Sequence, residues 1–264
     1  MSNSTAKTNS SRPIHSEDFS GDYSQPNSGI SAESKSKVWG LAAQSVGDVR
    51  IPKSYNQAVN SEAWPQWKKA IDSELMSLRK HRTWRTLTKT ESPENTENIV
   101  GSKWVFDLKT NKSGEILRYK ARLVAQGFTQ VEGVDYKETY APVASRTTLR
   151  MIMSIAAQMD LEVEQMDVCT AFLNASLSEK EQMYMRLPPG VTDEAAVVKL
   201  LRCLYGLKQS PREWNLVINA FLISLGYKRC KLDPCLYIYH DRDSGLFSFI
   251  LLYVDDLIIG SSTK

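Results

Sequence analysis

Hydrophobic residues form two short runs near the C-terminal end of the chain, at 249–254 and 257–259. Short apolar runs bounded by Gly and Ser are typical of buried strands. Asp255 and Asp256 separate the runs, so the pattern predicts a hairpin with two adjacent carboxylates at its turn. Two interpretations fit: the turn faces water, or the carboxylates bind a divalent cation, because hard cations take oxygen ligands.

Apolar residues at helical spacing predict three amphipathic helices. The first carries Trp64, Trp67, Ile71, Leu75 and Leu78 on one face. The second covers 147–159, with its methionines as core filler. In the third, Ser210 fits the N-cap, Pro211 fits the first helical position, Glu213 completes a capping box, and Gly226 fits the position after the end of the helix. Its predicted buried stripe is Trp214, Val217, Ile218, Phe221, Leu222 and Leu225.

Alternating residues predict a second hairpin, with strands at 103–109 and 116–125 and a turn that contains Gly114. Arg118, Lys120 and Arg122 share one face of its second strand, because successive side chains of a strand alternate. Such a row of cations either protects an edge strand from aggregation or holds phosphates through charge-assisted hydrogen bonds. The residues alone leave both functions open.

A strand at 161–168 places Val163, Gln165 and Asp167 on one face. Asp167, at the end of this strand, is either a functional carboxylate or a turn or helix-capping residue. Phe172 either packs in the core or lines a pocket beside Asp167. Further short strands are predicted at 84–87, 182–187, 197–201 and 236–239, a polar loop at 88–98 and irregular structure at 127–144. Gly206 either permits the close approach of a ligand or eases a turn.

The composition of the chain fits a globular protein, with 42% hydrophobic and 24% charged residues among 264. Its net charge of +3 is too small to indicate a polyanion partner. Residues 1–37 are rich in Ser, Asn, Lys and Gly, so we expect disorder there, followed by a linker up to residue 50. Neither a membrane span nor a secretory signal is predicted, so we expect an intracellular protein that binds no membrane.

The four cysteines lie at positions 169, 203, 230 and 235 and contain no CxxC pair. We expect reduced, buried thiols. Cys230, Cys235 and His240 have the wrong spacing for a zinc site and lack a fourth ligand.

Six segments, in this order, resemble the reverse transcriptase domain of copia-type LTR retrotransposon polyproteins. They are KWVF, RYKARLVAQGF, DYKETYAPVA, QMDVCTAFLNA, LYGLKQSPREW and LLYVDD. The resemblance extends from about Tyr55 to the C-terminus. It implies an α+β fold over residues 51–264, the fingers and palm of a right-hand polymerase.

The resemblance implies three catalytic aspartates. Asp167 matches the first one of the family, and Asp255 and Asp256 match its YxDD pair. They would bind two Mg²⁺ ions, about 3.5–4 Å apart, with Mn²⁺ as an alternative. Asp256 would support the other two carboxylates.

The resemblance also implies contacts with a dNTP and a primed RNA or DNA template. Lys120 and Arg122 match residues that grip the triphosphate, and Lys109 is a further candidate. Phe172 matches the aromatic ring under the sugar, and Gly206 belongs to the motif that packs on the nascent base pair. Asp107 stands where the family usually carries a basic residue.

The chain stops at Lys264, just after the hairpin, so we expect neither a thumb nor an RNase H domain. Primer–template affinity should then be poor, because the thumb holds the duplex largely through phosphate contacts. The expected function is RNA-directed DNA polymerase, impaired as a fragment, in cytoplasmic particles or in the nucleus. The alternatives are a non-catalytic retrotransposon relic that at most binds nucleic acid, and a two-metal nuclease that lacks an evident water-activating group.

Overall fold

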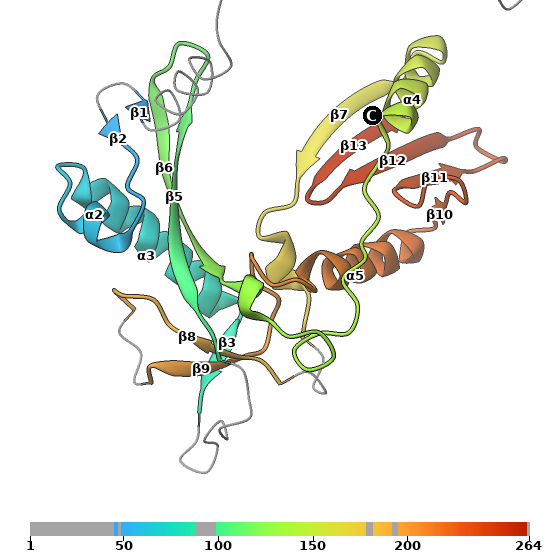
Figure 1. Cartoon of the computed structure of the whole chain (residues 1–264). Coiled ribbons are helices and arrows are strands. Elements are labelled where there is room, and N and C mark those ends of the chain that lie inside the picture. The colour runs from blue at the N-terminus through green and yellow to red at the C-terminus, as the bar shows by residue number, and fades with distance from the viewer. Residues whose placement is uncertain (1–44, 47–48, 88–98, 178–181, 192–194, 263–264) are drawn as a thin grey trace, which may run out of the picture. The chain divides into compact units, whose positions relative to one another are not determined.

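A computed structural model describes residues 45–46, 49–87, 99–177, 182–191 and 195–262 of the chain (Figure 1). The segment 1–37 predicted to be disordered and the predicted polar loop 88–98 lie outside these residues. Strands β1 (Ser45–Val46) and β2 (Val49–Arg50) pair antiparallel in the region predicted to be a linker. The described part of the chain has a mixed α and β structure, as predicted.

The largest sheet of the described residues has five antiparallel strands in the order β10-β11-β12-β13-β7. In chain order they are β7 (Glu162–Asp167), β10 (Lys228–Arg229), β11 (Leu236–His240), β12 (Phe247–Tyr253) and β13 (Asp256–Ser261). The predicted hairpin of the two apolar runs is therefore confirmed as β12 and β13. Strand β7 comes much earlier in the sequence and pairs with the last strand, β13 (Figure 1).

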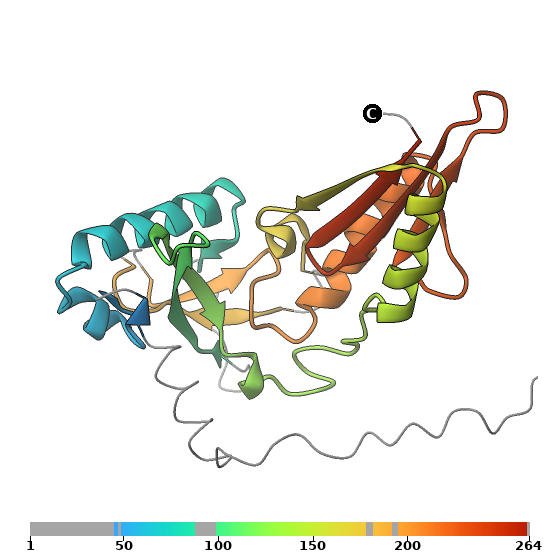
Figure 2. The same cartoon turned by 90° about the horizontal axis from the view of Figure 1, so that it is seen from above.

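Two helices cover opposite faces of this sheet, α4 (Arg146–Gln158) and α5 (Ser210–Ser224) (Figure 2). Alternate residues of β12 explain this arrangement, because they point to opposite sides. Phe249 and Leu251 pack in a cluster with Ile152 of α4. Ile250 and Leu252 belong to the main core, which contains Trp214, Ile218 and Leu222 of α5.

The second predicted hairpin is also confirmed. It consists of β5 (Ser102–Thr110) and β6 (Ile116–Ala125), with Gly114 at φ +83° in its turn. Helix α3 (Trp64–Lys80) packs its buried residues against this hairpin, and the Trp67 ring contacts Phe106 and Tyr119 edge-on. The apolar stripe of α3 thus packs on the hairpin, and the cations on the other face of β6 line the site described below.

The smaller elements complete the described chain. They are α2 (Tyr55–Val59), β3 (Trp84–Thr86), β4 (Ile99–Val100), the 3₁₀ turns η1 (Gly127–Thr129) and η2 (Ala171–Asn174), β8 (Tyr184–Arg186) and β9 (Val197–Leu200). Strands β3, β9, β8 and β4 form a second sheet in that order. None of the described helices is both long and apolar enough to cross a membrane.

The predicted capping box of α5 is wrong. The N-cap residue is Gln209, and Ser210 is the first helical residue. Ser210 is fully buried, and its hydroxyl donates to the Leu204 carbonyl at 2.7 Å instead of accepting from the helix. The predicted end of the helix is confirmed, since Gly226 follows it with φ +91°.

Several apolar helix residues that were predicted to be core are exposed. They are Met151, Met153 and Met159 in and after α4, and Val217, Phe221 and Leu225 in and after α5. Each helix contacts the sheet through a narrower stripe than its apolar residues span, so the prediction was wrong for these six positions. The thiol of Cys169 is exposed as well, whereas Cys203 and Cys235 are buried.

Candidate active site

Strand pairing brings the three aspartates together from two distant segments. Asp167, the last residue of β7, lies opposite Asp256, the first residue of β13. Tyr253 pairs with Asp256, so Val254 and Asp255 form a two-residue turn between β12 and β13. The backbone amide of Val168 donates to the carbonyl of Asp255 at 2.8 Å, which ties the turn to the end of β7.

Two of these carboxylates and the three cations of β6 line one cavity of about 300 Å³. The carboxylates belong to Asp167 and Asp255, and the cations are Arg118, Lys120 and Arg122. Carboxylates on one side and a row of cations on the other make a cavity suited to a ligand that is both a phosphate ester and a metal chelate.

Asp256 lies outside this cavity. It lines a different pocket, and its Oδ1 accepts a hydrogen bond from Gln165 Nε2 at 3.4 Å. No cluster of three or more His, Cys, Asp or Glu side chains suited to a metal ion occurs in the part of the chain that the structure describes. The pair Asp167 and Asp255 still fits Mg²⁺, which uses one or two carboxylates and completes its octahedron with water and substrate phosphates.

Several positive charges lie close together on the cationic side of the cavity. Burial lowers the pKa of the Lys120 ammonium, and the nearby cations Arg122, Lys109 and Arg118 lower it further. Asp167 acts in the opposite direction. The cations therefore repel one another, and an anion bound between them would relieve that repulsion.

Lys109 is placed differently from the other predicted cations. Its ammonium forms an ion pair with Asp107 at 3.0 Å, and its side chain does not line the cavity. Asp107 is the acidic residue at a position where a basic one was expected. Its carboxylate is the ion-pair partner of the Lys109 ammonium.

Glu74 of α3 is a residue of this cavity that the sequence interpretation did not find. Its Oε1 accepts a hydrogen bond from the Leu123 amide of β6 at 3.2 Å. Burial raises the pKa of its carboxyl group, while that hydrogen bond and the cations Arg122, Lys120 and Arg118 act to lower it. A signal was present, because Glu74 lies one helical turn from Ile71 and from Leu78 and so borders the apolar stripe.

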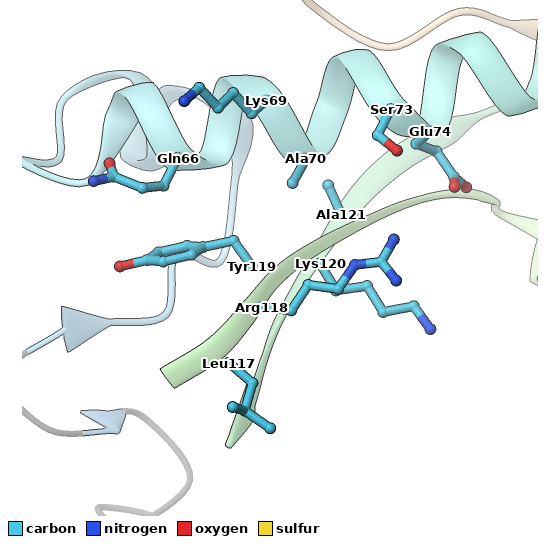
Figure 3. A pocket seen from close by; sticks show the side chains of 10 residues that line it. All are labelled: Gln66, Lys69, Ala70, Ser73, Glu74, Leu117, Arg118, Tyr119, Lys120 and Ala121. Carbon is cyan, nitrogen blue, oxygen red and sulfur yellow. The ribbon is translucent and has the colours of Figure 1, made fainter. Parts of the chain in front are cut away.

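A second pocket of about 300 Å³ lies between α3 and β6, and Figure 3 shows its side chains. Glu74 reaches from the helix toward the strand there, with Arg118 and Lys120 on that strand (Figure 3). These three residues line both pockets. Glu74 is thus the acidic group set between α3 and the cationic face of β6.

Tyr205 is the second residue that the sequence interpretation missed. Its hydroxyl donates to Asp255 Oδ2 at 3.4 Å, and the Arg122 guanidinium carbon lies 5.3 Å from the centre of its ring. Burial raises the pKa of the Tyr205 hydroxyl, and the charge of Asp255 adds to this effect. The sequence offered no signal, because both contacts join segments far apart in the chain.

Phe172 is buried beside Tyr205, and the two rings meet edge-on with their centres 4.7 Å apart. Its side chain does not line the cavity of the aspartates. Of the two interpretations of this residue, packing in the core describes its present contacts. Its contact with a substrate sugar stays a prediction.

Gly206 does not line the cavity either, but its backbone explains why glycine stands there. Its φ is +93°, and a Cβ at this position would lie 2.0 Å from the Ala125 carbonyl oxygen and 2.7 Å from Val124 Cγ1. The backbone that approaches Gly206 closely is therefore β6 itself. The nascent base pair stays a predicted neighbour.

The turn that carries Asp255 has an unusual backbone. Val254 has φ +59°, in the left-handed region that β-branched residues rarely adopt. The indole Nε1 of Trp214, in α5, donates to the Val254 carbonyl at 2.6 Å. The buried indole thus stabilises a strained turn next to the candidate catalytic carboxylate.

Comparison with known proteins defines the class. A family model described as reverse transcriptase (RNA-dependent DNA polymerase) matches residues 81–264, which is well over half of the chain. The chain belongs to this family. The resemblance to copia-type reverse transcriptases, first seen in six short segments, is thereby confirmed.

Plant retrotransposon polyproteins are among the similar curated proteins. The chain is 39% identical over 222 residues to the retrovirus-related Pol polyprotein from transposon TNT 1-94 of Nicotiana tabacum. It is 36% identical over 211 residues to that from transposon RE1 of Arabidopsis thaliana. These alignments cover 83% and 79% of this chain but only 16% and 14% of the two relatives.

A solved structure of a foamy viral protease-reverse transcriptase in complex with double-stranded DNA also matches. The match covers 72% of this chain and 25% of that one, at 14% sequence identity and a TM-score of 0.35. A TM-score this low does not establish a shared fold, so the family assignment stands on the sequence.

Proposed function

We propose that this chain forms the fingers and palm of an RNA-directed DNA polymerase that joins a dNTP to the 3′-hydroxyl of a primer. One observation carries the proposal. Asp167 and Asp255, which are far apart in the sequence, line one cavity together with the row of cations on β6. This is the combination that a metal-dependent nucleotidyl transfer requires.

Asp167 and Asp255 would hold Mg²⁺, which when bound supplies charge neutralisation and helps to deprotonate the primer hydroxyl. Asp256, at the register position opposite Asp167, would support them from the neighbouring side. The fit rests on two carboxylates that face one cavity, one at the end of β7 and one in the turn between β12 and β13. Room remains there for phosphate oxygens as further ligands.

Lys120 and Arg122 would bind the triphosphate by charge-assisted hydrogen bonds, with Arg118 beside them. In the transfer, the primer 3′-oxygen forms a bond to the α-phosphorus, and the bond to the bridging oxygen of pyrophosphate breaks. Negative charge builds up on the leaving pyrophosphate. Fixed cations close to that group stabilise the developing charge without reorganisation of solvent.

A single-nucleotide primer extension with Mg²⁺, at high primer–template concentration, tests the proposal. Asp167→Asn and Asp255→Asn should each lower the rate by about 100-fold or more, the scale of losing an essential electrostatic group. Asp243→Asn, in an exposed turn, is the matched control and should keep the wild-type rate. Wild-type incorporation that survives Asp255→Asn would overturn the proposal.

The same preparation can distinguish a chain that binds the primer–template duplex weakly from a chain that lacks a working active site. Binding of a fluorescent dNTP in the presence of Mn²⁺ is measured on the protein without the duplex. We expect wild type to bind it and Asp167→Asn to bind it much more weakly. A non-catalytic relic would show neither incorporation nor metal-dependent dNTP binding.

A further inference from the structure

We propose that Tyr205 is a positioning residue with two separable roles: its hydroxyl orients the Asp255 carboxylate, and its ring supports the Arg122 guanidinium. The inference rests on the proposed function and extends it to a residue that lies between the carboxylates and the cations of the cavity. Tyr205 joins the acidic and the cationic sides of the same cavity, because it lines that cavity and contacts one residue of each side.

The backbone of Tyr205 is fixed before its side chain makes any contact. Its carbonyl accepts a hydrogen bond from the Ala125 amide at 2.8 Å, at the end of β6. The residues Leu204 and Leu207 on either side of it are buried, and Gly206 packs on the same strand. A side chain that starts from so constrained a backbone can hold other groups in place.

The hydroxyl contact acts on Asp255. A carboxylate has two oxygens, and Tyr205 donates to Oδ2 at 3.4 Å. That contact favours one rotation of the carboxyl group, in which Oδ1 would be available to a cation. Asp255 sits in a two-residue turn, so its side chain needs such a partner to keep one orientation.

The ring contact acts on Arg122. Its guanidinium carbon lies 5.3 Å from the ring centre, within the range of a cation–π contact. Phe172 meets the Tyr205 ring edge-on and restricts its rotation. Phe172 therefore acts indirectly in this structure: it packs against the Tyr205 ring, and that ring contacts the Arg122 guanidinium.

Two substitutions separate the two roles. Tyr205→Phe removes only the hydroxyl, whereas Tyr205→Leu removes the hydroxyl and the aromatic face. Tyr227→Phe is the matched control, because it removes a tyrosine hydroxyl that contacts Ser248, outside the cavity. Each variant is assayed by primer extension for kcat, for the dNTP KM and for the Mg²⁺ concentration that gives half the maximal rate.

For Tyr205→Phe we expect a rise of about 3- to 10-fold in the half-saturating Mg²⁺ concentration, the scale of one net hydrogen bond, with the dNTP KM within about twofold of wild type. For Tyr205→Leu we expect an additional rise of about 3- to 10-fold in the dNTP KM, within the range of a cation–π contact. In an Arg122→Ala background, Tyr205→Leu should raise that KM no further. A purely structural role would not produce this split.

A readout without turnover covers the case of an inactive chain. Mn²⁺ binding to the free protein, followed by electron paramagnetic resonance, should weaken in Tyr205→Phe and more strongly in Asp255→Asn, but not in Tyr227→Phe. The inference is overturned if Tyr205→Phe behaves like Tyr227→Phe in both assays, or if all parameters fall together with thermal stability. If incorporation instead survives Asp255→Asn, it is the proposed function that fails.

Discussion

Gly127 and Gly206 pack backbone against backbone, so closely that a Cβ on Gly127 would lie 2.0 Å from the Gly206 carbonyl oxygen. Gly206 in turn approaches the Ala125 carbonyl, where its own Cβ would also lie at 2.0 Å. The end of β6 and the segment before α5 are therefore in direct backbone contact. This contact sets the position of Tyr205 and, through it, the relation between cations and carboxylates.

Gly206→Ala should break this contact. The new methyl group would collide with backbone, and φ +93° is unfavourable for any residue with a Cβ. We expect a loss of roughly 2–4 kcal/mol in the free energy of unfolding, from overpacking and backbone strain together, measured by urea denaturation. Gly114→Ala is the control: its φ is +83° but nothing lies within 4 Å, so only about 1–2 kcal/mol of strain applies. Equal losses in the two variants would contradict the tight contact.

Lys120→Ala should raise the dNTP KM by about tenfold or more, the scale of one charge-assisted hydrogen bond. Lys109→Ala should raise it less, because Lys109 is paired with Asp107 and lies outside the cavity. Lys112→Ala, in the exposed turn of the same hairpin, controls for the loss of net charge. Steady-state primer extension at varied dNTP concentration measures all three, and a larger effect at Lys109 would reverse the assignment.

Asp256→Asn should be tolerated better than Asp255→Asn. Asp256 lines a different pocket and contacts Gln165, whereas Asp255 shares the cavity with Asp167. We expect a rate loss within about tenfold for Asp256→Asn and of about 100-fold or more for Asp255→Asn, where an essential electrostatic group is lost. Single-turnover extension compares them directly. Equal losses would show that Asp256 turns into the cavity when substrate binds.

Glu74 should make stability fall as the pH rises. Burial raises its pKa above the ordinary value of 4.5, so the folded protein holds this proton more tightly than the unfolded chain. The free energy of unfolding should then decrease as the pH rises from about 4.5 through the raised pKa, because the unfolded chain binds fewer protons there. Denaturant titrations across this range should show the decrease in wild type and a weaker one in Glu74→Gln, which keeps an acceptor for the Leu123 amide. An unchanged slope in Glu74→Gln would assign the pH dependence to another group.

Local patterns in the sequence predicted the local elements well. The two hairpins are confirmed because alternation and turn residues act over neighbouring positions, as with Gly114 between β5 and β6. The pairing of β7 with β13 joins segments far apart in the chain, and no local pattern encodes it. Only the resemblance to a family indicated that Asp167 and Asp255 would share a site.

The errors have a physical cause in tertiary contacts. Ser210 looked like an N-cap, but a buried hydroxyl takes the nearest acceptor, which here is the Leu204 carbonyl. Phe221 fitted an apolar stripe, yet it is exposed because the sheet contacts a narrower part of α5. Glu74 and Tyr205 were missed since their partners, Leu123 and Asp255, come from other elements.

The hydrogen bond from Trp214 to the Val254 carbonyl makes the position of the turn that carries Asp255 depend on α5. Val254 holds an unfavourable φ of +59°, so the turn has a reason to relax as soon as the indole withdraws. If α5 moved away from the turn, the hydrogen bond from Trp214 would break, and Asp255 would change position before the sheet itself unfolds. If the proposed function holds, heating should therefore abolish primer extension at a lower temperature than it abolishes secondary structure, because the contact with α5 is what keeps the turn of Asp255 in place.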